Sequence, residues 1–385
     1  MSDSVKRRET FYLAGFDPRG ARHYHNLYKK EAALQSKVNE IEMEISQRKR
    51  TDTHIQSWSI QASSQHKDTQ TNYHFLEWDD IIRENWKKNF ISLFMDLLFY
   101  FKTYILAGRF IKYMRVSPRQ MIGIFFPIVF LIVAIGISMM LGDFIASMID
   151  GVYGLLLGMT AAIMMIYLLF VLGNKLALFW LLRIFVFSAR YVFEDMHTLD
   201  KRLEYFSKYL ISVLEKQKEN KVDEILLVSH SVGGILMIPL LEKLLKEKSL
   251  PEDTKLSILV LGECIPLVSG IDKATEYKEK MAFLAKQTNI FWLDYTTVID
   301  GACFPHLNYF SDVNIDIEEK ENFHFLSARF HTLFSKRRYD KLRKNRYLTH
   351  FIYLMSMEYE GKYDFFNMTA GHQYLYNSIK GRNTK

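Results

Sequence analysis

The residues best suited to chemistry surround a serine that lies between two apolar segments. A short apolar run at 225–228 follows charged residues, and the sequence SHSVGG at 229–234 separates it from a second apolar segment. An apolar run of this length, bounded by turn residues, is typical of a buried strand. Small residues around Ser231 permit a sharp strand-to-helix turn that holds its side chain in a strained, exposed position. This pattern predicts nucleophilic chemistry by the Ser231 hydroxyl.

Residues 229–234 resemble the nucleophile elbow of the α/β-hydrolase superfamily, whose pattern is G-x-S-x-G. Ser231 matches the nucleophile and Gly233 the second glycine, while Ser229 stands where the first glycine is usual. Serine is still small enough for a helix to cross close to the strand. The chain therefore looks like a serine esterase or lipase of this superfamily, in a membrane-anchored form of the bacterial type. The alternative is a glycine-bearing turn in another α/β protein.

The resemblance implies an acid and a base downstream of Ser231, because a serine nucleophile needs a base and the base needs an acid to orient it. In the superfamily the order is serine, acid, histidine, and the acid lies in a loop beyond a later strand. Asp294 and Asp300 both fit, and we prefer Asp300 because it lies in the loop proper. Either aspartate could instead be an ordinary turn residue.

The base is chosen by the same order. The main candidates downstream of the acid are His324, His331 and His350. We prefer His350 because it directly precedes an apolar helical segment, where the superfamily commonly carries its histidine. His331 is the second choice, and a packed structural histidine is the default interpretation of any one of them.

The resemblance also implies an oxyanion hole formed by two backbone N–H groups. A predicted strand at 10–14 is followed by a loop at 15–20 that has turn residues at both ends. Superfamily members place one oxyanion donor in such a loop and the other just after the nucleophile. The implied donors are the N–H groups of Phe16 and Val232. An ordinary glycine turn is the alternative for the loop.

Two long apolar stretches form the strongest compositional signal. Residues 121–141 and 152–172 are each 21 residues without charge. About 20 apolar residues are needed to cross the hydrocarbon core, so the sequence predicts a transmembrane hairpin. Two buried helices of a soluble protein are the alternative. Gly154 and Gly158 form a G-x-x-x-G motif, which allows close helix packing and hence a homo-oligomer through the hairpin.

Charges around the hairpin predict its orientation. The loop at 142–151 contains no Lys or Arg, whereas basic residues lie on both outer flanks: Arg109, Lys112, Arg115, Arg119, Lys175, Arg183 and Arg190. The positive-inside rule then places both flanks, both termini and the catalytic part in the cytoplasm, at the cytoplasmic (inner) membrane. The aromatic segments 90–114 and 176–187 are expected to be interfacial helices.

The remaining pattern predicts an α/β fold with a mostly parallel, α/β-hydrolase-like sheet. We expect further strands at 54–60, 73–76, 256–261 and 289–293, helices at 31–50 and 200–217, and a polar loop at 61–71. The hairpin then interrupts one hydrolase domain. The predicted parts are 1–88 with the oxyanion strand and loop, 89–190 as the membrane insertion, and 191–385 with the nucleophile, acid and histidine.

Composition limits the remaining function classes. The chain has 385 residues, 49% of them hydrophobic, a net charge of +7 and a pI near 9.0. No basic block carries the pattern of a nucleic-acid module, so a membrane surface is the expected partner. Cys264 and Cys303 lie in no ligand cluster, so we expect no metal and no cofactor. The resulting hypothesis is a membrane-anchored serine hydrolase that cleaves a lipid-like acyl ester. The alternative is an inactive hydrolase-like scaffold.

Overall fold

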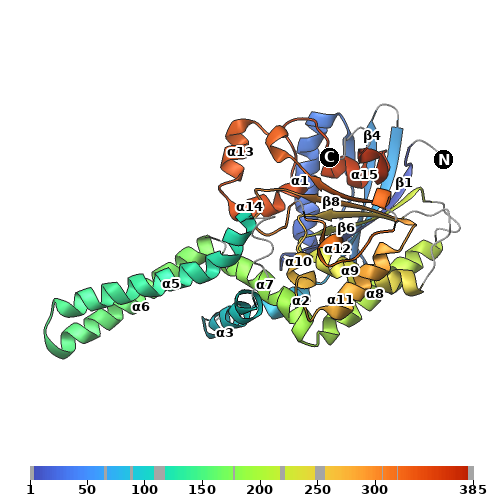
Figure 1. The fold of residues 1–385 in the computed structure, drawn as a ribbon. Coiled ribbons are helices and arrows are strands. Elements are labelled where there is room, and N and C mark those ends of the chain that lie inside the picture. The colour runs from blue at the N-terminus through green and yellow to red at the C-terminus, as the bar shows by residue number, and fades with distance from the viewer. Residues whose placement is uncertain are drawn as a thin grey trace. The chain divides into compact units, whose positions relative to one another are not determined.

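The computed structural model describes residues 4–64, 67–86, 90–107, 118–176, 178–216, 222–247, 256–305, 307–318 and 320–379. The chain divides into two compact units. The first contains residues 1–86 and 190–385, and the second contains residues 87–189. These limits lie close to the predicted ones, and the first unit is assembled from both sides of the apolar insertion (Figure 1).

The first unit contains one mixed sheet and its covering helices. Its strands are β1 (Arg7–Leu13), β2 (Glu42–Ile45), β3 (Lys49–Asp52), β4 (Ile55–Ser64), β5 (Lys67–Leu76), β6 (Glu224–His230), β7 (Leu256–Leu261), β8 (Ile290–Thr296) and β9 (Phe323–Ser327). Its main helices are α1 (Gly20–Asn39), α2 (Asp79–Asn85), α8 (His197–Lys216), α9 (Val232–Glu247), α10 (Pro266–Ser269), α11 (Thr275–Ala285), α12 (Tyr309–Asp312), α13 (Lys336–Leu342), α14 (Arg346–Phe351) and α15 (Phe365–Ala370).

The sheet is mostly parallel. Its strand order is β2-β4-β5-β1-β6-β7-β8-β9, with β3 paired to β4. The pairs from β5 through β9 are parallel, and β4 is antiparallel to its neighbours. β1 lies between β5 and β6, so the N-terminal strand is central (Figure 1). This architecture confirms the predicted α/β class with a mostly parallel sheet, and the likeness of that sheet to the α/β-hydrolases stays a prediction.

Side chains on the two faces of the central strands pack against different layers of helices. Leu226 and Val228 of β6 join an aromatic core with Tyr12, Tyr24 and Tyr353. That layer includes α1 and the C-terminal helices, while α8, α9 and α11 pack together in another layer. β6 is buried along its whole length, as expected for a parallel strand covered on both faces.

Two local predictions were wrong, and one strand was missed. The predicted helix at 31–50 ends at Asn39, where Glu40 adopts a left-handed φ of +55°, and β2 and β3 follow. Of the predicted loop at 61–71, residues 61–64 belong to β4 and residues 67–71 to β5, which pair with each other. β9 was not predicted at all. These strands are half-exposed or exposed at the sheet margin, so their sequences lack the apolar run that reveals a buried strand.

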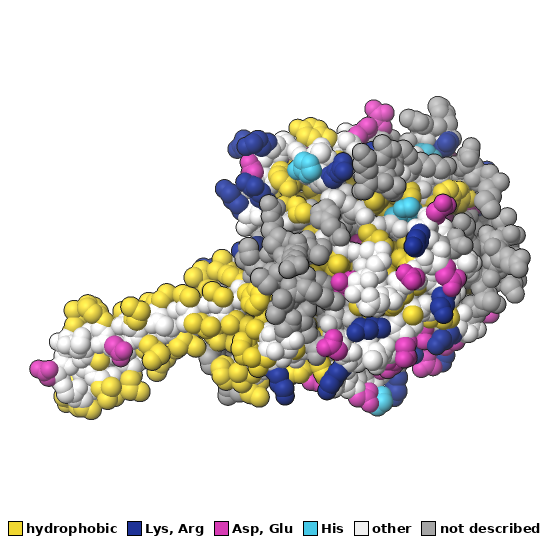
Figure 2. All heavy atoms as spheres, viewed as in Figure 1, with side chains coloured by type: hydrophobic (Ala, Val, Ile, Leu, Met, Phe, Trp, Pro, Cys, Tyr) yellow, Lys and Arg dark blue, Asp and Glu magenta, His cyan; other side chains and the backbone are white. Residues whose placement is uncertain are grey.

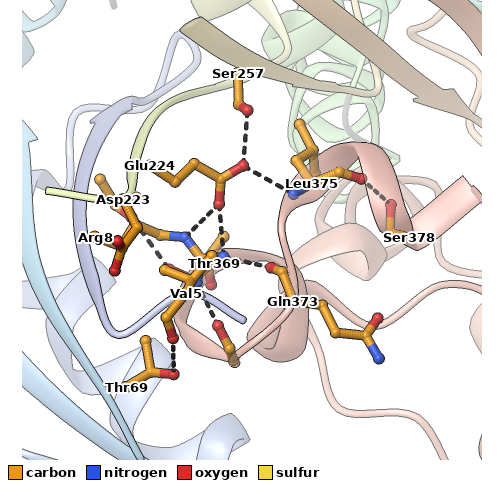
Figure 3. A network of polar contacts seen from close by, with 12 residues as sticks. Val5, Arg8, Thr69, Asp223, Glu224, Ser257, Thr369, Gln373, Leu375 and Ser378 are labelled. Atoms are coloured by element: carbon orange, nitrogen blue, oxygen red, sulfur yellow. Dashed lines mark hydrogen bonds and ion pairs between the residues drawn. The ribbon is translucent and has the colours of Figure 1, made fainter. Parts of the chain in front are cut away.

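A buried ionic network lies at the start of the central strands β1 and β6. Arg8 and Glu224 form a salt bridge of 2.7 Å, with side chains 0% and 2% exposed. Arg8 also donates to the carbonyl oxygens of Gly371 and Gln373, and Glu224 accepts from Ser257 and from the N–H of Leu375 (Figure 3). Charges are tolerated in a protein interior when they are paired and hydrogen-bonded. The network fixes the C-terminal segment against β1 and β6.

The second unit is helical and largely apolar. Its elements are α3 (Phe90–Tyr100), a π-helical turn η1 (Phe101–Leu106), α5 (Pro118–Ser147), α6 (Gly151–Lys175) and α7 (Leu178–Phe193), whose last residues enter the first unit. Two helical segments, Gly123–Ala146 and Gly151–Lys175, are long and apolar enough to cross a membrane. Apolar side chains cover the visible sides of this hairpin (Figure 2).

The glycine motif of α6 is used inside the hairpin. A Cβ at Gly158 would collide with the carbonyl oxygen of Gly142 and lie 2.8 Å from Cβ of Ala146. Gly154 is similarly crowded by the backbone at Ala146 and Ile149. The face that we expected to be available for a second copy is therefore covered by α5. The glycine motif therefore no longer supports the predicted homo-oligomer.

The crowding at Gly158 predicts a matched pair of variants. We expect Gly158→Ile to separate α5 from α6 and to lower the free energy of unfolding by about 1–3 kcal/mol, the usual range for overpacking. Gly136→Ile is the control, because a Cβ there meets nothing within 4 Å. Thermal unfolding in detergent measures both. Equal melting temperatures for the two variants would contradict the contact.

The two segments that we expected to be interfacial helices, 90–114 and 176–187, either differ from that expectation or lie partly outside the described residues. Residues 181–189 of α7 are all buried in succession, which differs from the one-sided burial expected of a helix at a lipid interface. Of the segment predicted at 90–114, residues 108–114 lie outside the described residues. Three of the flanking cations used for orientation, Arg109, Lys112 and Arg115, lie outside them too.

Candidate active site

Ser231 occupies a strained turn between β6 and α9. Its φ is +58°, in the left-handed region that costs a residue other than glycine about 1–3 kcal/mol. The turn is fixed by two hydrogen bonds, from the N–H of Ser231 to Leu261 (2.9 Å) and from the N–H of Gly234 to Ser231 (2.9 Å). The strand-to-helix turn predicted around Ser231 is therefore present. Strain of this kind is characteristic of functional sites.

Two glycines allow backbone to approach this turn. A Cβ at Gly15 would lie 2.7 Å from Cβ and 3.2 Å from Oγ of Ser231, so the loop after β1 passes directly over the serine. A Cβ at Gly233 would collide with the carbonyl oxygen of Leu13. At the position of the usual first glycine, Ser229 is fully buried, and no hydrogen-bond partner of its Oγ lies among the described residues. Serine at this position is thus sterically compatible with the turn.

One predicted oxyanion donor, Val232, directly follows Ser231 in the chain, and the other, Phe16, lies in the loop after β1 that passes over the serine. Val232 is the first residue of α9, where a backbone N–H has no partner within its own helix. Phe16 directly follows Gly15, and its ring stacks on Trp86 with centroids 5.6 Å apart. Their assignment as oxyanion donors stays a prediction.

Asp300 and His350 form a buried pair. Nδ1 of His350 lies 3.0 Å from Oδ1 and 2.9 Å from Oδ2 of Asp300. Asp300 lies in the loop after β8 and also accepts from the N–H of Ala302 (3.0 Å), while His350 lies in the last turn of α14. A carboxylate at Nδ1 favours the tautomer that keeps its proton there and leaves Nε2 as the basic nitrogen.

A short series of contacts joins Ser231 to this pair. Oγ of Ser231 lies 3.5 Å from Sγ of Cys264, and that sulfur lies 3.4 Å from the carbonyl oxygen of Ala302. Ala302 in turn donates to Asp300. Burial raises the pKa of the Cys264 thiol, and the nearby Glu263 and Asp300 raise it further, so it remains protonated at neutral pH. The three residues of the predicted triad thus belong to one contiguous buried cluster.

The other candidates lie elsewhere. Asp294 is inside β8 and accepts from the hydroxyl of Tyr309 (2.9 Å). His331 is exposed, with its ring 6.3 Å from that of Tyr339. Nε2 of His324 contacts the carbonyl oxygen of Glu321 at 2.8 Å. Among the candidates that we considered, only Asp300 and His350 are brought together.

Comparison of the chain with protein-family models, with curated proteins and with solved structures returned no match.

The helix that carries His350 is held by residues whose roles the sequence did not reveal. Nε2 of His230 lies 2.7 Å from the carbonyl oxygen of His350, and burial lowers the pKa of His230 to about 3. His230 is therefore neutral and donates to that oxygen. From the loop after β1, Arg19 lies over the ring of Phe351 at 4.8 Å and is itself fixed by Asp17. These contacts connect the elbow and the predicted oxyanion loop to α14.

The cluster is enclosed and fits acid–base chemistry. Ser231 is 2% exposed, His350 1% and Asp300 0%. Among the described residues, no group of three or more His, Cys, Asp or Glu side chains is placed to hold a metal ion. A hydroxyl, an imidazole and a carboxylate are sufficient for acyl transfer, provided that substrate gains access to Ser231.

Two buried carboxyls beside the cluster predict a pH effect on stability. Burial raises the pKa of Asp294 to about 8, and burial together with Asp294 raises that of Glu263. An unfolded aspartate loses its proton near pH 4, so this contribution is complete below pH 4 and is lost as pH rises through 8. We expect the free energy of unfolding to fall by up to about 1.4 kcal/mol per pH unit for each such group.

Asp294→Asn tests this directly. The amide cannot ionise, so the variant is expected to lose one group's share of the slope between pH 4 and 8. Asp316→Asn, at an exposed carboxyl, is the control and should keep the wild-type slope. Urea unfolding at a series of pH values measures all three proteins. A wild-type slope in Asp294→Asn would show that this carboxyl is not held protonated.

Proposed function

We propose that this chain is a membrane-associated serine hydrolase that cleaves acyl esters. The observation that carries the proposal is the strained Ser231 at the end of a central parallel strand, in one buried cluster with the Asp300–His350 pair. Nucleophile, acid and base also follow along the chain in the order that the α/β-hydrolase resemblance implies.

The proposed reaction uses only side chains and backbone of this chain. Oγ of Ser231 attacks the acyl carbonyl carbon while Nε2 of His350 takes the hydroxyl proton. Asp300 holds the imidazole through Nδ1 and stabilises the imidazolium. The N–H groups of Phe16 and Val232 stabilise the oxyanion, which is commonly the largest single contribution.

The second half of the reaction releases the acyl group. The tetrahedral intermediate collapses, the bond to the leaving alcohol breaks, and His350 returns its proton to that alcohol. Water, deprotonated by His350, then attacks the acyl-enzyme; the bond between the acyl carbon and Oγ breaks, and His350 returns the proton to Oγ, which releases the acid and restores Ser231.

The lipid nature of the ester is proposed from position. Two helices long and apolar enough to span a membrane lie within the same chain as the cluster. An enzyme anchored in a bilayer meets lipids at high local concentration. We propose the cytoplasmic face of the inner membrane, because the Lys and Arg residues flank the hairpin on the outside of its two helices.

Two observations favour a second candidate function. All three proposed catalytic side chains are buried, and Ser229 departs from the usual motif. An inactive hydrolase-like scaffold that binds another protein would have the same fold and need no access to Ser231.

Labelling of membranes with a fluorophosphonate probe separates the two functions. We expect a covalent adduct on the wild-type protein that is lost in Ser231→Ala and strongly reduced in His350→Ala. Ser269→Ala is the control for removal of another buried hydroxyl. Labelling of wild type but not of Ser231→Ala, with His350→Ala unaffected, would move the base elsewhere. No labelling of folded wild-type protein in lipid would favour the scaffold.

A further inference from the structure

A strongly basic surface segment is not used by the proposed chemistry. Seven of the eleven residues at 336–346 are Lys or Arg, and Asp340 is the only acid among them. We refer to residues 336–346 as the basic segment. It comprises α13 and the turn into α14, and most of its cations are exposed: Lys336, Arg337, Lys341, Arg343, Lys344 and Arg346. Lys and Arg side chains gather around α13 in Figure 2.

The acids around the basic segment neutralise only part of its charge. Asp340 lies 3.4 Å from Lys336 and 3.1 Å from Arg343, and Glu358 lies 3.4 Å from Arg338. Within the described part of the chain, Arg337, Lys341 and Lys344 have no ion pair. Like charges held this close repel one another, so these three unpaired cations do not stabilise the segment and instead present a positive field to solvent.

The basic segment is joined directly to the helix of the proposed base. Leu342 is buried and anchors the end of α13, and the side chain of Asn345 accepts from the N–H of Leu348 at the start of α14. His350 follows Asn345 by five positions. A ligand of the basic segment would therefore bind beside α14, the helix that carries His350.

We propose that the basic segment binds the anionic head groups of lipids in the bilayer that holds α5 and α6. Its charge is complementary to an anionic lipid surface, which attracts clustered Lys and Arg additively. The membrane hairpin keeps the domain near that surface, which raises the effective concentration of head groups. The proposal rests on the hairpin spanning a membrane and is independent of the serine chemistry.

The composition of the segment favours lipid over nucleic acid. Single-stranded nucleic acids are bound by basic grooves that also offer aromatic faces for stacking of bases. Tyr339 is the only aromatic residue in the basic segment, and its side chain is half-buried with its ring near His331. Head groups need only accessible cations, which the segment supplies.

Hydrogen exchange in nanodiscs tests the proposal on the full chain. One set of discs contains phosphatidylcholine alone, and the other contains phosphatidylcholine mixed with phosphatidylglycerol. We expect amides of residues 336–346 to exchange roughly tenfold more slowly in the mixed discs at low salt. High salt should remove the difference, because it screens exposed charges.

Charge reversal supplies the matched comparison. Lys341→Glu combined with Lys344→Glu should abolish the slowing, whereas Lys201→Glu combined with Lys286→Glu, at exposed positions on other elements, should retain it. Equal exchange of the wild-type segment in both kinds of disc would overturn the proposal. So would protection by single-stranded RNA in phosphatidylcholine discs without protection by phosphatidylglycerol, which would assign the segment to nucleic acid. Fluorophosphonate labelling in the same discs reports separately on Ser231, so failure of one proposal is distinguishable from failure of the other.

Discussion

Replacing Asp300 by asparagine is expected to slow fluorophosphonate labelling of Ser231 by about four orders of magnitude. The amide nitrogen of asparagine donates rather than accepts, so it favours the imidazole tautomer whose proton is on Nε2. His350 could then no longer take the proton of Ser231. The fold should survive, because the side chain keeps its shape and an oxygen for the N–H of Ala302.

The control for this variant is Asp294→Asn. Asp294 is the other aspartate of the same strand-loop region, but its hydrogen-bond partner is Tyr309. We expect its labelling rate to stay within about threefold of the wild-type rate, since it does not contact the proposed base. Time courses of labelling give the two rate constants. A slow Asp294→Asn together with a normal Asp300→Asn would reverse the assignment of the acid.

The largest effect on stability is expected at the other end of the sheet, at Arg8. Arg8→Met leaves Glu224 buried without its cation and removes the donors to Gly371 and Gln373. Breaking a buried pair by removing one partner costs about 3–5 kcal/mol. The C-terminal segment, which Arg8 holds to β1 (Figure 3), should be the first to lose its protection.

Two further variants serve as a control and as a partial rescue of stability. Lys208→Met breaks an exposed pair with Glu204 and should leave the free energy of unfolding nearly unchanged, because solvent screens such a pair. Arg8→Met combined with Glu224→Met should recover part of the loss, because no unpaired charge remains. Urea unfolding followed by tryptophan fluorescence measures all of them. A cost at Arg8 no larger than that at Lys208 would refute the importance of the pair.

The parts of the fold that could be predicted are those with a local signal. β7 was predicted with its observed limits, because a central parallel strand is apolar on both faces and stands out between charged or polar turns. β2 and β3 were mistaken for the end of a helix, because their residues are mostly polar and include good helix formers such as Glu and Lys. Their strand structure comes from pairing with β4, which lies later in the chain.

In the candidate site, too, only the part with a local sequence signal could be predicted. Ser231 could be found from its immediate neighbours, since small residues and an apolar run define the turn. The pairing of Asp300 with His350 joins residues 50 positions apart. Asp294 and His331 fit the same chain order, so Asp300 was preferred only for its place in the loop proper and His350 only for its place before an apolar helical segment. The supporting roles of His230, Arg19 and Cys264 had no local signal, because each depends on which distant element packs against it.

The central position of β1 has a consequence for biosynthesis. β1 pairs with β6 in a register that sets Leu13 against Ser229, so the middle of the sheet cannot be completed until the ribosome has delivered residue 229. Both apolar helices leave the ribosome before that point. They would be recognised for membrane insertion before β6 is available to pair with β1. During this interval β1 has an open edge, which is prone to pair with other chains. Translation that stops just after the hairpin should therefore yield an aggregation-prone fragment attached to the membrane, and the nascent chain should depend on chaperones until β6 closes the gap.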